Sequence, residues 1–140
     1  ERFRYHVLSS TMKTIENQYE VREQQLIDHL NRLRDFDGLQ NEISFDLGKA
    51  NEYLQAAEVA IEQIERDEFD FVPDEVVPPN LNNAEIHIQK LSRNVDKLKH
   101  QGYPNEQEIR NHLNNVTRRH LELSERFLIS NKVLDFQSQS

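Results

Sequence analysis

The chain has 140 residues, of which 36% are apolar and 30% are charged, with three Gly, four Pro and no Cys. This length predicts one compact domain, or one repeat with a piece of its neighbour. The absence of Cys argues against a disulfide-stapled fold and thiolate zinc sites. Residues 37–80 carry two basic against twelve acidic side chains, a balance of −10, within a net charge of −8. Such an acidic segment argues against binding to nucleic acid.

The first predicted helix covers residues 1–36. Its apolar residues follow the three-four spacing of a heptad, with one missing position near Arg22 and Glu23. The row consists of Leu8, Met12, Ile15, Tyr19, Leu26, Leu30 and Leu33. After it, Asp37 can cap a helix and Gln40 can close a capping box, so the stretch Asp37-Gly38-Leu39-Gln40 predicts a bend or tight turn.

A second apolar row predicts a helix that ends before a proline-rich loop. The row consists of Leu47, Ala50, Leu54, Ala57, Ile61 and Ile64. Residues 69–80 contain three of the four prolines, and proline does not continue a helix interior, so the sequence predicts a loop there. The third helix is predicted to begin at Asn80 or Asn82.

Two further apolar rows predict a pair of antiparallel helices joined by a short turn. The third row consists of Leu81, Ala84, Ile88, Leu91, Val95 and Leu98, and the fourth of Ile109, Leu113, Val116, His120, Leu123 and Phe127. Between them Gly102 is predicted to end one helix, Pro104 to lie in the first turn of the next, and Asn105 and Glu108 to form a capping pair. Residues 137–140 are predicted to fray.

Together these rows predict an all-α fold: an antiparallel three-helix bundle over residues 37–136, preceded by an additional long helix over residues 1–36. Heptad rows on antiparallel helices pack around one shared seam. We expect the core seam to include Leu54, Ile61, Ile88, Leu91, Val95, Val116, His120 and Phe127.

The second half of the chain resembles a spectrin repeat. The residues that carry the resemblance are Ala84 to Leu91, the turn His100-Gln101-Gly102-Tyr103-Pro104, the helix opening Glu106-Gln107-Glu108-Ile109, and Asn111 to Leu123. The resemblance implies a repeat with helices at about residues 38–68, 81–101 and 105–136. His120 stands where many spectrin repeats carry a Trp, and the chain has no Trp.

Residues 12–36, followed by the helix that contains Tyr53 to Ile61, further resemble the plakin domain of plakins and spectraplakins. This resemblance implies a structural spacer in a cytoskeletal linker that connects filaments to cell junctions or to one another. It also implies that residues 1–36 belong to an adjoining repeat. Dystrophin-type and nuclear-envelope spectrin-repeat proteins are alternative parents, and pairing of the leading helix with a second copy in a homodimeric coiled coil is an alternative arrangement.

The apolar residues around the proline-rich loop are the candidate partner-binding site. They either fold back over the bundle or contact a neighbouring repeat or a cytoskeletal component. As an alternative function, the acidic helix and the loop over residues 68–79 dock a junctional receptor tail or an adaptor protein. The candidate residues are Phe69, Phe71, Val72, Asp74, Val76 and Val77.

No residue pattern indicates a metal, a cofactor or catalysis. None of the six His residues has a Glu three positions before it, so the di-iron bundle motif is missing. The acidic loop lacks the spacing of an EF-hand. We find no Gly-rich phosphate loop and no catalytic triad pattern. No apolar run has the length of a membrane span, so the sequence predicts no membrane insertion. Together these observations predict a cytoplasmic, non-enzymatic module whose partners are proteins.

Overall fold

The computed structural model describes residues 2–139, and the side chains of residues 7–135. It contains three helices, α1 (Arg2–Glu65), α2 (Pro73–Gln101) and α3 (Glu106–Gln139), and no strand within the described residues. The predicted all-α helical bundle is confirmed. The chain divides into two compact units, residues 1–40 and residues 41–140.

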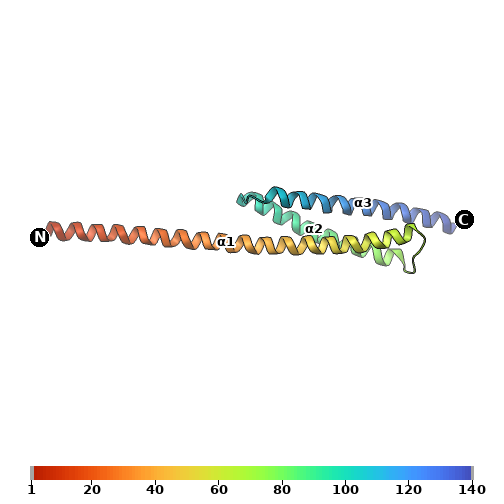
Figure 1. Cartoon of the computed structure of the whole chain (residues 1–140), viewed down its shortest axis with the longest axis horizontal. Coiled ribbons are helices and arrows are strands. Elements are labelled where there is room, and N and C mark those ends of the chain that lie inside the picture. Colours follow the sequence, from red (N-terminus) through yellow and green to blue (C-terminus); the bar gives the residue numbers. More distant parts are fainter. Residues whose placement is uncertain (1, 140) are drawn as a thin grey trace. The chain divides into compact units, whose positions relative to one another are not determined.

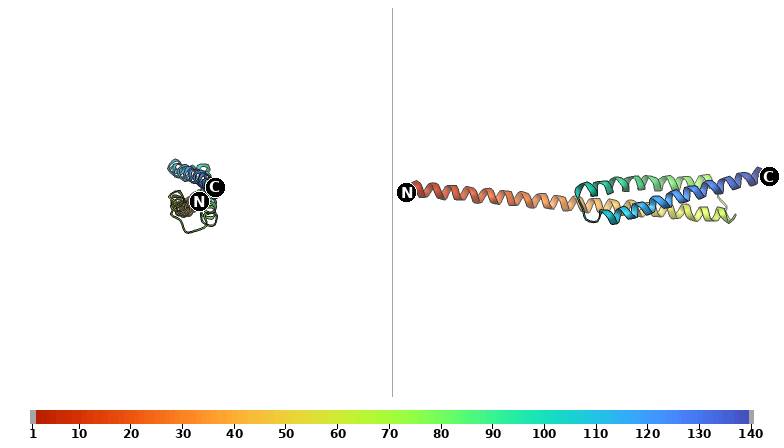
Figure 2. Two further views of the ribbon diagram at one scale, coloured as in Figure 1. Left: turned by 90° about the vertical axis from the view of Figure 1, so that its right-hand side faces the viewer. Right: turned by 90° about the horizontal axis from the view of Figure 1, so that it is seen from above.

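The second unit is an antiparallel three-helix bundle made by the C-terminal part of α1, α2 and α3. Figures 1 and 2 show these three segments lying side by side, with α2 and α3 joined by a short turn. Apolar side chains from all three helices are buried between them. They include Ile43, Leu54, Ile61, Val77, Leu91, Val95, Leu98, Val116, Leu123 and Phe127. Of the predicted seam, Ile88 and His120 are half-buried and the other six residues are buried.

The bend that we predicted at residues 37–40 is wrong, because α1 is helical throughout this stretch. Asp and Gly lower helix stability by only about 1 kcal/mol or less relative to Ala, so a single Gly38 is tolerated inside a long helix. A Cβ on Gly38 would meet no atom within 4 Å. Leu39 within the predicted break and Ile43 just after it are both buried. Burial of residues four apart favours the helical backbone that places them on one face.

The predicted loop over residues 69–80 is also wrong in its second half, since α2 begins at Pro73 rather than at Asn80 or Asn82. Pro73 occupies the first turn, where a backbone N–H has no partner in any helix. Pro78 and Pro79 lie inside the helix and remove two further hydrogen bonds. The buried Val77 holds this turn against the core. The Asn80 side-chain amide donates to the carbonyl of Val76 at 2.8 Å.

Two helix ends use the same left-handed cap. Gly102 ends α2 with φ 72°, and the amides of Gly102 and Tyr103 donate to the last carbonyls of the helix at 3.1 Å each. Asp67 has φ 58° after α1, and its amide and that of Glu68 make the equivalent bonds to Ile64 and Gln63. Both ends match the Schellman motif, in which the residue after the helix adopts positive φ.

The start of α3 differs from the prediction. The helix begins at Glu106, so Pro104 lies before it rather than in its first turn. The side-chain oxygen of Asn105 is buried without a hydrogen-bond partner, so the predicted capping pair with Glu108 does not form. At the other end α3 continues through Gln139, which includes residues 137–139 of the predicted frayed tail. Ser140 lies outside the described residues.

The first unit consists of the N-terminal part of α1. Its apolar row is exposed: Leu8, Met12, Ile15, Tyr19, Leu26, Leu30 and Leu33 are between 47% and 70% accessible. Because α1 continues into the bundle, the heptads of this row can be compared with those of the buried part. The seven-residue spacing of Met12, Tyr19, Leu26 and Leu33 continues without insertion through Gln40, Leu47, Leu54 and Ile61.

Candidate functional site

The six candidate partner-binding residues fall into three environments. Val77 is fully buried in the core, which removes it from any external surface. Asp74 is exposed, and one of its carboxylate oxygens accepts a hydrogen bond of 3.1 Å from the side-chain amide of Asn131 on α3. Val72 caps the start of α2 and is 53% exposed. Phe69, Phe71 and Val76 are half-buried.

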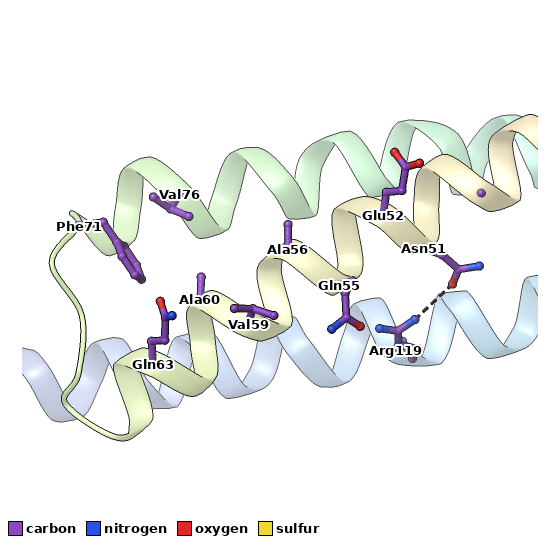
Figure 3. Close-up of a pocket in the computed structure, with 11 residues that line it drawn as sticks. Asn51, Glu52, Gln55, Ala56, Val59, Ala60, Gln63, Phe71, Val76 and Arg119 are labelled. Atoms are coloured by element: carbon purple, nitrogen blue, oxygen red, sulfur yellow. Dashed lines mark hydrogen bonds between the residues drawn. The ribbon is translucent and has the colours of Figure 1, made fainter.

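Phe71 and Val76 close one end of an open groove on the bundle (Figure 3). The groove has a volume of about 860 Å³, and its floor is formed by α1 between Gly48 and Gln63. The Phe69 ring contacts Phe71 with ring centres 5.6 Å apart, so the loop holds the two aromatic rings together. The loop therefore folds back in part and leaves Phe71 at the border of an accessible, mostly apolar surface.

The groove owes its depth to small residues on α1. Gly48, Ala56 and Ala60 lie along its floor, separated by eight and four residues and therefore on one helix face. Val59 adds an exposed aliphatic surface. Such a surface can pack against apolar side chains of another helix or peptide, because backbone approach is close wherever the side chains are small.

Arg119 of α3 forms the far border of the groove. Its guanidinium donates to the Glu58 carboxylate at 3.1 Å. It also donates to the Asn51 side-chain oxygen at 3.2 Å (Figure 3). Both members of the ion pair are about one third exposed. The pair links α3 to α1 across the groove and balances the charges of Arg119 and Glu58, so among the described residues that line the groove only Glu52 carries a charge that this pair does not balance.

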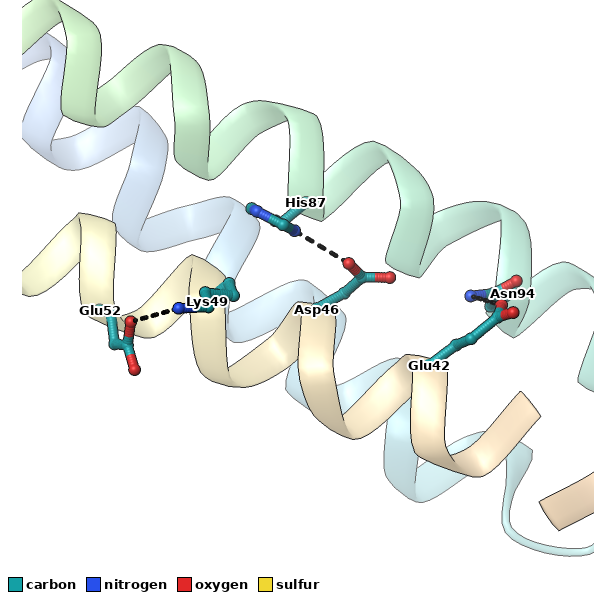
Figure 4. A network of polar contacts seen from close by, with 6 residues as sticks. All are labelled: Glu42, Asp46, Lys49, Glu52, His87 and Asn94. Carbon is teal, nitrogen blue, oxygen red and sulfur yellow. Dashed lines mark hydrogen bonds and ion pairs between the residues drawn. The ribbon is translucent and has the colours of Figure 1, made fainter. Parts of the chain in front are cut away.

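A second polar cluster joins α1 to α2 (Figure 4). His87 Nδ1 lies 2.9 Å from a carboxylate oxygen of Asp46, which is 5% exposed. The rings of Phe45 and Tyr53 flank the imidazole, each with its centre 5.9 Å away. A buried carboxylate requires such a partner because desolvation without one is costly. The cluster holds the two helices in a single register.

About one turn towards the N-terminus of α1, a second contact also joins α1 to α2. The buried Asn94 side-chain amide of α2 donates to the Glu42 carboxylate at 3.3 Å. Our sequence analysis missed both contacts. A signal for the first was present, since Asp46 and His87 each directly precede a residue of a predicted apolar row, Leu47 and Ile88 respectively. When a helix packs against two other helices, a residue beside its apolar row is buried as well.

Two further contacts tie α3 to its neighbours. The half-buried His120 donates from Nε2 to the backbone carbonyl of Leu81 over 3.0 Å, so this seam residue is a satisfied core histidine. Near the end of α1, Arg126 of α3 pairs with Glu65. The hydrogen bond to the Glu65 carboxylate raises the pKa of the Arg126 guanidinium above its usual value, and desolvation opposes this effect. The guanidinium is therefore charged at all pH values at which the bundle folds.

The described side chains include no group of three or more His, Asp or Glu that is placed to hold a metal ion. Among the described residues, none of the helices combines the length and apolarity that crossing a bilayer requires. The chain was also compared with known proteins. No family model, no curated protein and no solved structure matches this chain.

Proposed function

We propose that this chain is a structural spacer of a cytoskeletal linker protein of the plakin type, in which it connects filaments to cell junctions or to one another. The observation that carries the proposal is that α1 passes from the first unit into the bundle with no non-helical residue between them. A spacer requires such a connection, because a flexible linker would absorb displacement instead of transmitting it.

The polar contacts along α1 support the same proposal. Asp46, Glu58 and Glu65 each pair with a basic side chain or His of another helix, and together they cover the length of α1 inside the bundle. Sliding α1 past both of its neighbours would break all three pairs, because Asp46 pairs with α2 whereas Glu58 and Glu65 pair with α3. The proposal involves no catalysis, and it assigns the chain to the cytoplasm at cytoskeletal structures or junctions.

Filament spacing provides a direct test of the spacer proposal. An actin-binding module is fused to each end of the 140-residue chain, and the distance between bundled filaments is measured by electron cryotomography. We expect a narrow distribution of distances with the native chain and with Gly38→Ala. Gly38→Pro should broaden the distribution, because proline breaks the helix at the boundary between the units. Equal distributions of filament distances for Gly38→Pro and Gly38→Ala would contradict the proposal. Binding of the unfused chain to filaments would also contradict it.

The groove supports a second candidate function, the binding of a protein partner such as a junctional receptor tail. The specific observation is that Phe71 and Val76 border an apolar groove within a strongly acidic part of the chain. An apolar groove with an acidic surrounding is complementary to a basic amphipathic segment.

The binding proposal is tested with matched loop variants and a set of fluorescently labelled receptor-tail peptides. Phe71→Ser should weaken the binding of a true partner by about tenfold or more, because it removes an aromatic side chain from the groove. Val72→Ser is the control, since Val72 is exposed in the same segment but does not line the groove. Circular dichroism confirms that both variants keep their helicity. Equal affinities for both variants would rule out the groove as the docking site.

A further inference from the structure

The exposed apolar row of the first unit has the width of a seam for one partner helix. We use the heptad letters that place Met12, Tyr19, Leu26 and Leu33 at position a. Leu8 and Ile15 then occupy position d. The g positions on one side of this row are all polar, and Leu30 is the one apolar residue at the e positions on the other side. The g residues are Thr11, Gln18, Gln25 and Arg32, and the e residues include Glu16 and Glu23.

The bundled part of α1 differs at the same positions. There Asp46 and Ala60, both at position g, are buried together with all the a and d residues except the half-buried Leu47, and Tyr53 at g is half-buried. A helix with two neighbours buries this wider surface, whereas a stripe limited to a and d is typical of a two-stranded coiled coil. The same unbroken heptad register therefore serves a three-helix interface in residues 41–65 and indicates a two-helix interface in residues 8–33.

Two polar residues within the row select the orientation of the partner helix. Arg22 and His29 both occupy position d. In a parallel, in-register pair each would face its own copy, and two permanently charged guanidinium groups would be forced together in a desolvated layer. An antiparallel pair instead brings position a of one chain opposite position d of the other.

With full overlap of residues 8–33, the antiparallel register places the two arginines in two adjacent layers instead of in one layer. Arg22 then faces the ring of Tyr19 on the second copy, an arrangement that favours a cation–π contact. His29 faces Met12. The remaining layers are purely aliphatic, with Leu8 opposite Leu33 and Ile15 opposite Leu26.

We propose that the first unit is a homodimerisation site, at which residues 8–33 of two copies of this chain form an antiparallel two-stranded coiled coil. The dimer carries one three-helix bundle on each chain. It therefore converts a spacer module into a symmetric crosslinker with two equivalent bundles.

Oligomeric state is tested by sedimentation equilibrium of the full 140-residue chain over a range of concentrations. We expect a monomer–dimer equilibrium. Ile15→Ser with Leu26→Ser should weaken dimerisation by at least about tenfold. The matched control is Val21→Ser with Ile27→Ser, because these side chains are exposed on the same helix outside the a and d positions. A monomer at all concentrations, a trimer or larger assembly, or equal weakening by both double variants would overturn the proposal.

Orientation is tested by disulfide exchange, which the absence of native Cys makes unambiguous. Ile15→Cys and Leu26→Cys are prepared separately, one with a mass tag, and oxidised in a glutathione buffer alone and as a mixture. The antiparallel dimer predicts that the mixed disulfide between the two variants predominates, because only those positions face each other. Predominance of the two homodisulfides would indicate a parallel dimer and would overturn the assignment.

Discussion

Replacement of Leu91 by Ala tests whether the core lies where the three helices place it. Leu91 is fully buried in the bundle, and the substitution removes three carbon atoms. At about 0.8 kcal/mol for each buried methylene, the lost transfer free energy is about 2.4 kcal/mol. The cavity left behind adds to this figure, within the range of about 2 to 5 kcal/mol that is typical of such substitutions. We therefore expect the free energy of unfolding to fall by about 3 kcal/mol.

Ile88→Ala is the matched comparison, since Ile88 lies one turn earlier on α2 and is only half-buried. It should lower the free energy of unfolding by about 1 to 1.5 kcal/mol, roughly half the value for Leu91, in proportion to the area removed from water. Urea unfolding followed by far-ultraviolet circular dichroism measures both at one chain concentration, because self-association would shift the midpoint. A loss below about 0.5 kcal/mol for Leu91→Ala, or a larger loss for Ile88→Ala, would refute the packing.

Three further predictions concern helix ends, the prolines of α2 and the surface ion pair, and all are measured by urea unfolding. Asp67 and Gly102 both have positive φ, which glycine adopts more readily than other residues. Asp67→Gly should therefore stabilise the chain by about 1 kcal/mol, and Gly102→Ala should destabilise it by about 1 kcal/mol. Changes of the opposite sign would contradict the two caps. Pro79→Ala should stabilise the chain by about 1 to 3 kcal/mol by restoring a helical hydrogen bond, whereas a loss would place Pro79 outside the helix. A double-mutant cycle on Glu58 and Arg119 should give a coupling below about 1 kcal/mol that decreases with salt, and a larger, salt-independent value would indicate a buried pair.

The apolar rows made the three helices of the bundle predictable, because each helix buries one stripe at heptad spacing. Leu54, Leu91 and Val116 fall where the rows place them. The errors come from local signals that tertiary packing overrides. Gly38 within a capping pattern predicted a break, yet burial of the apolar residues around it keeps α1 helical. In the same way, burial of Val77 draws the prolines of the predicted loop into the first turns of α2.

The candidate site was predictable only in part. The loop composition drew attention to Phe71 and Val76, which border the groove, but not to the small residues of α1 that form its floor. Small residues are also compatible with an ordinary exposed helix surface. The groove can therefore be recognised only when the position of the loop relative to α1 is known. The apolar rows indicate that Asp46 and His87 each lie beside a buried stripe, but they do not show that these two residues, 41 positions apart, contact each other.

Backbone NMR of residues 34–44 tests whether one uninterrupted helix joins the first unit to the bundle. The structure predicts helical carbon-13 chemical shifts for every residue of this stretch, including Asp37 and Gly38. Random-coil shifts at residues 37–40, flanked by helical values on both sides, would contradict an uninterrupted helix and would indicate a hinge between the two units.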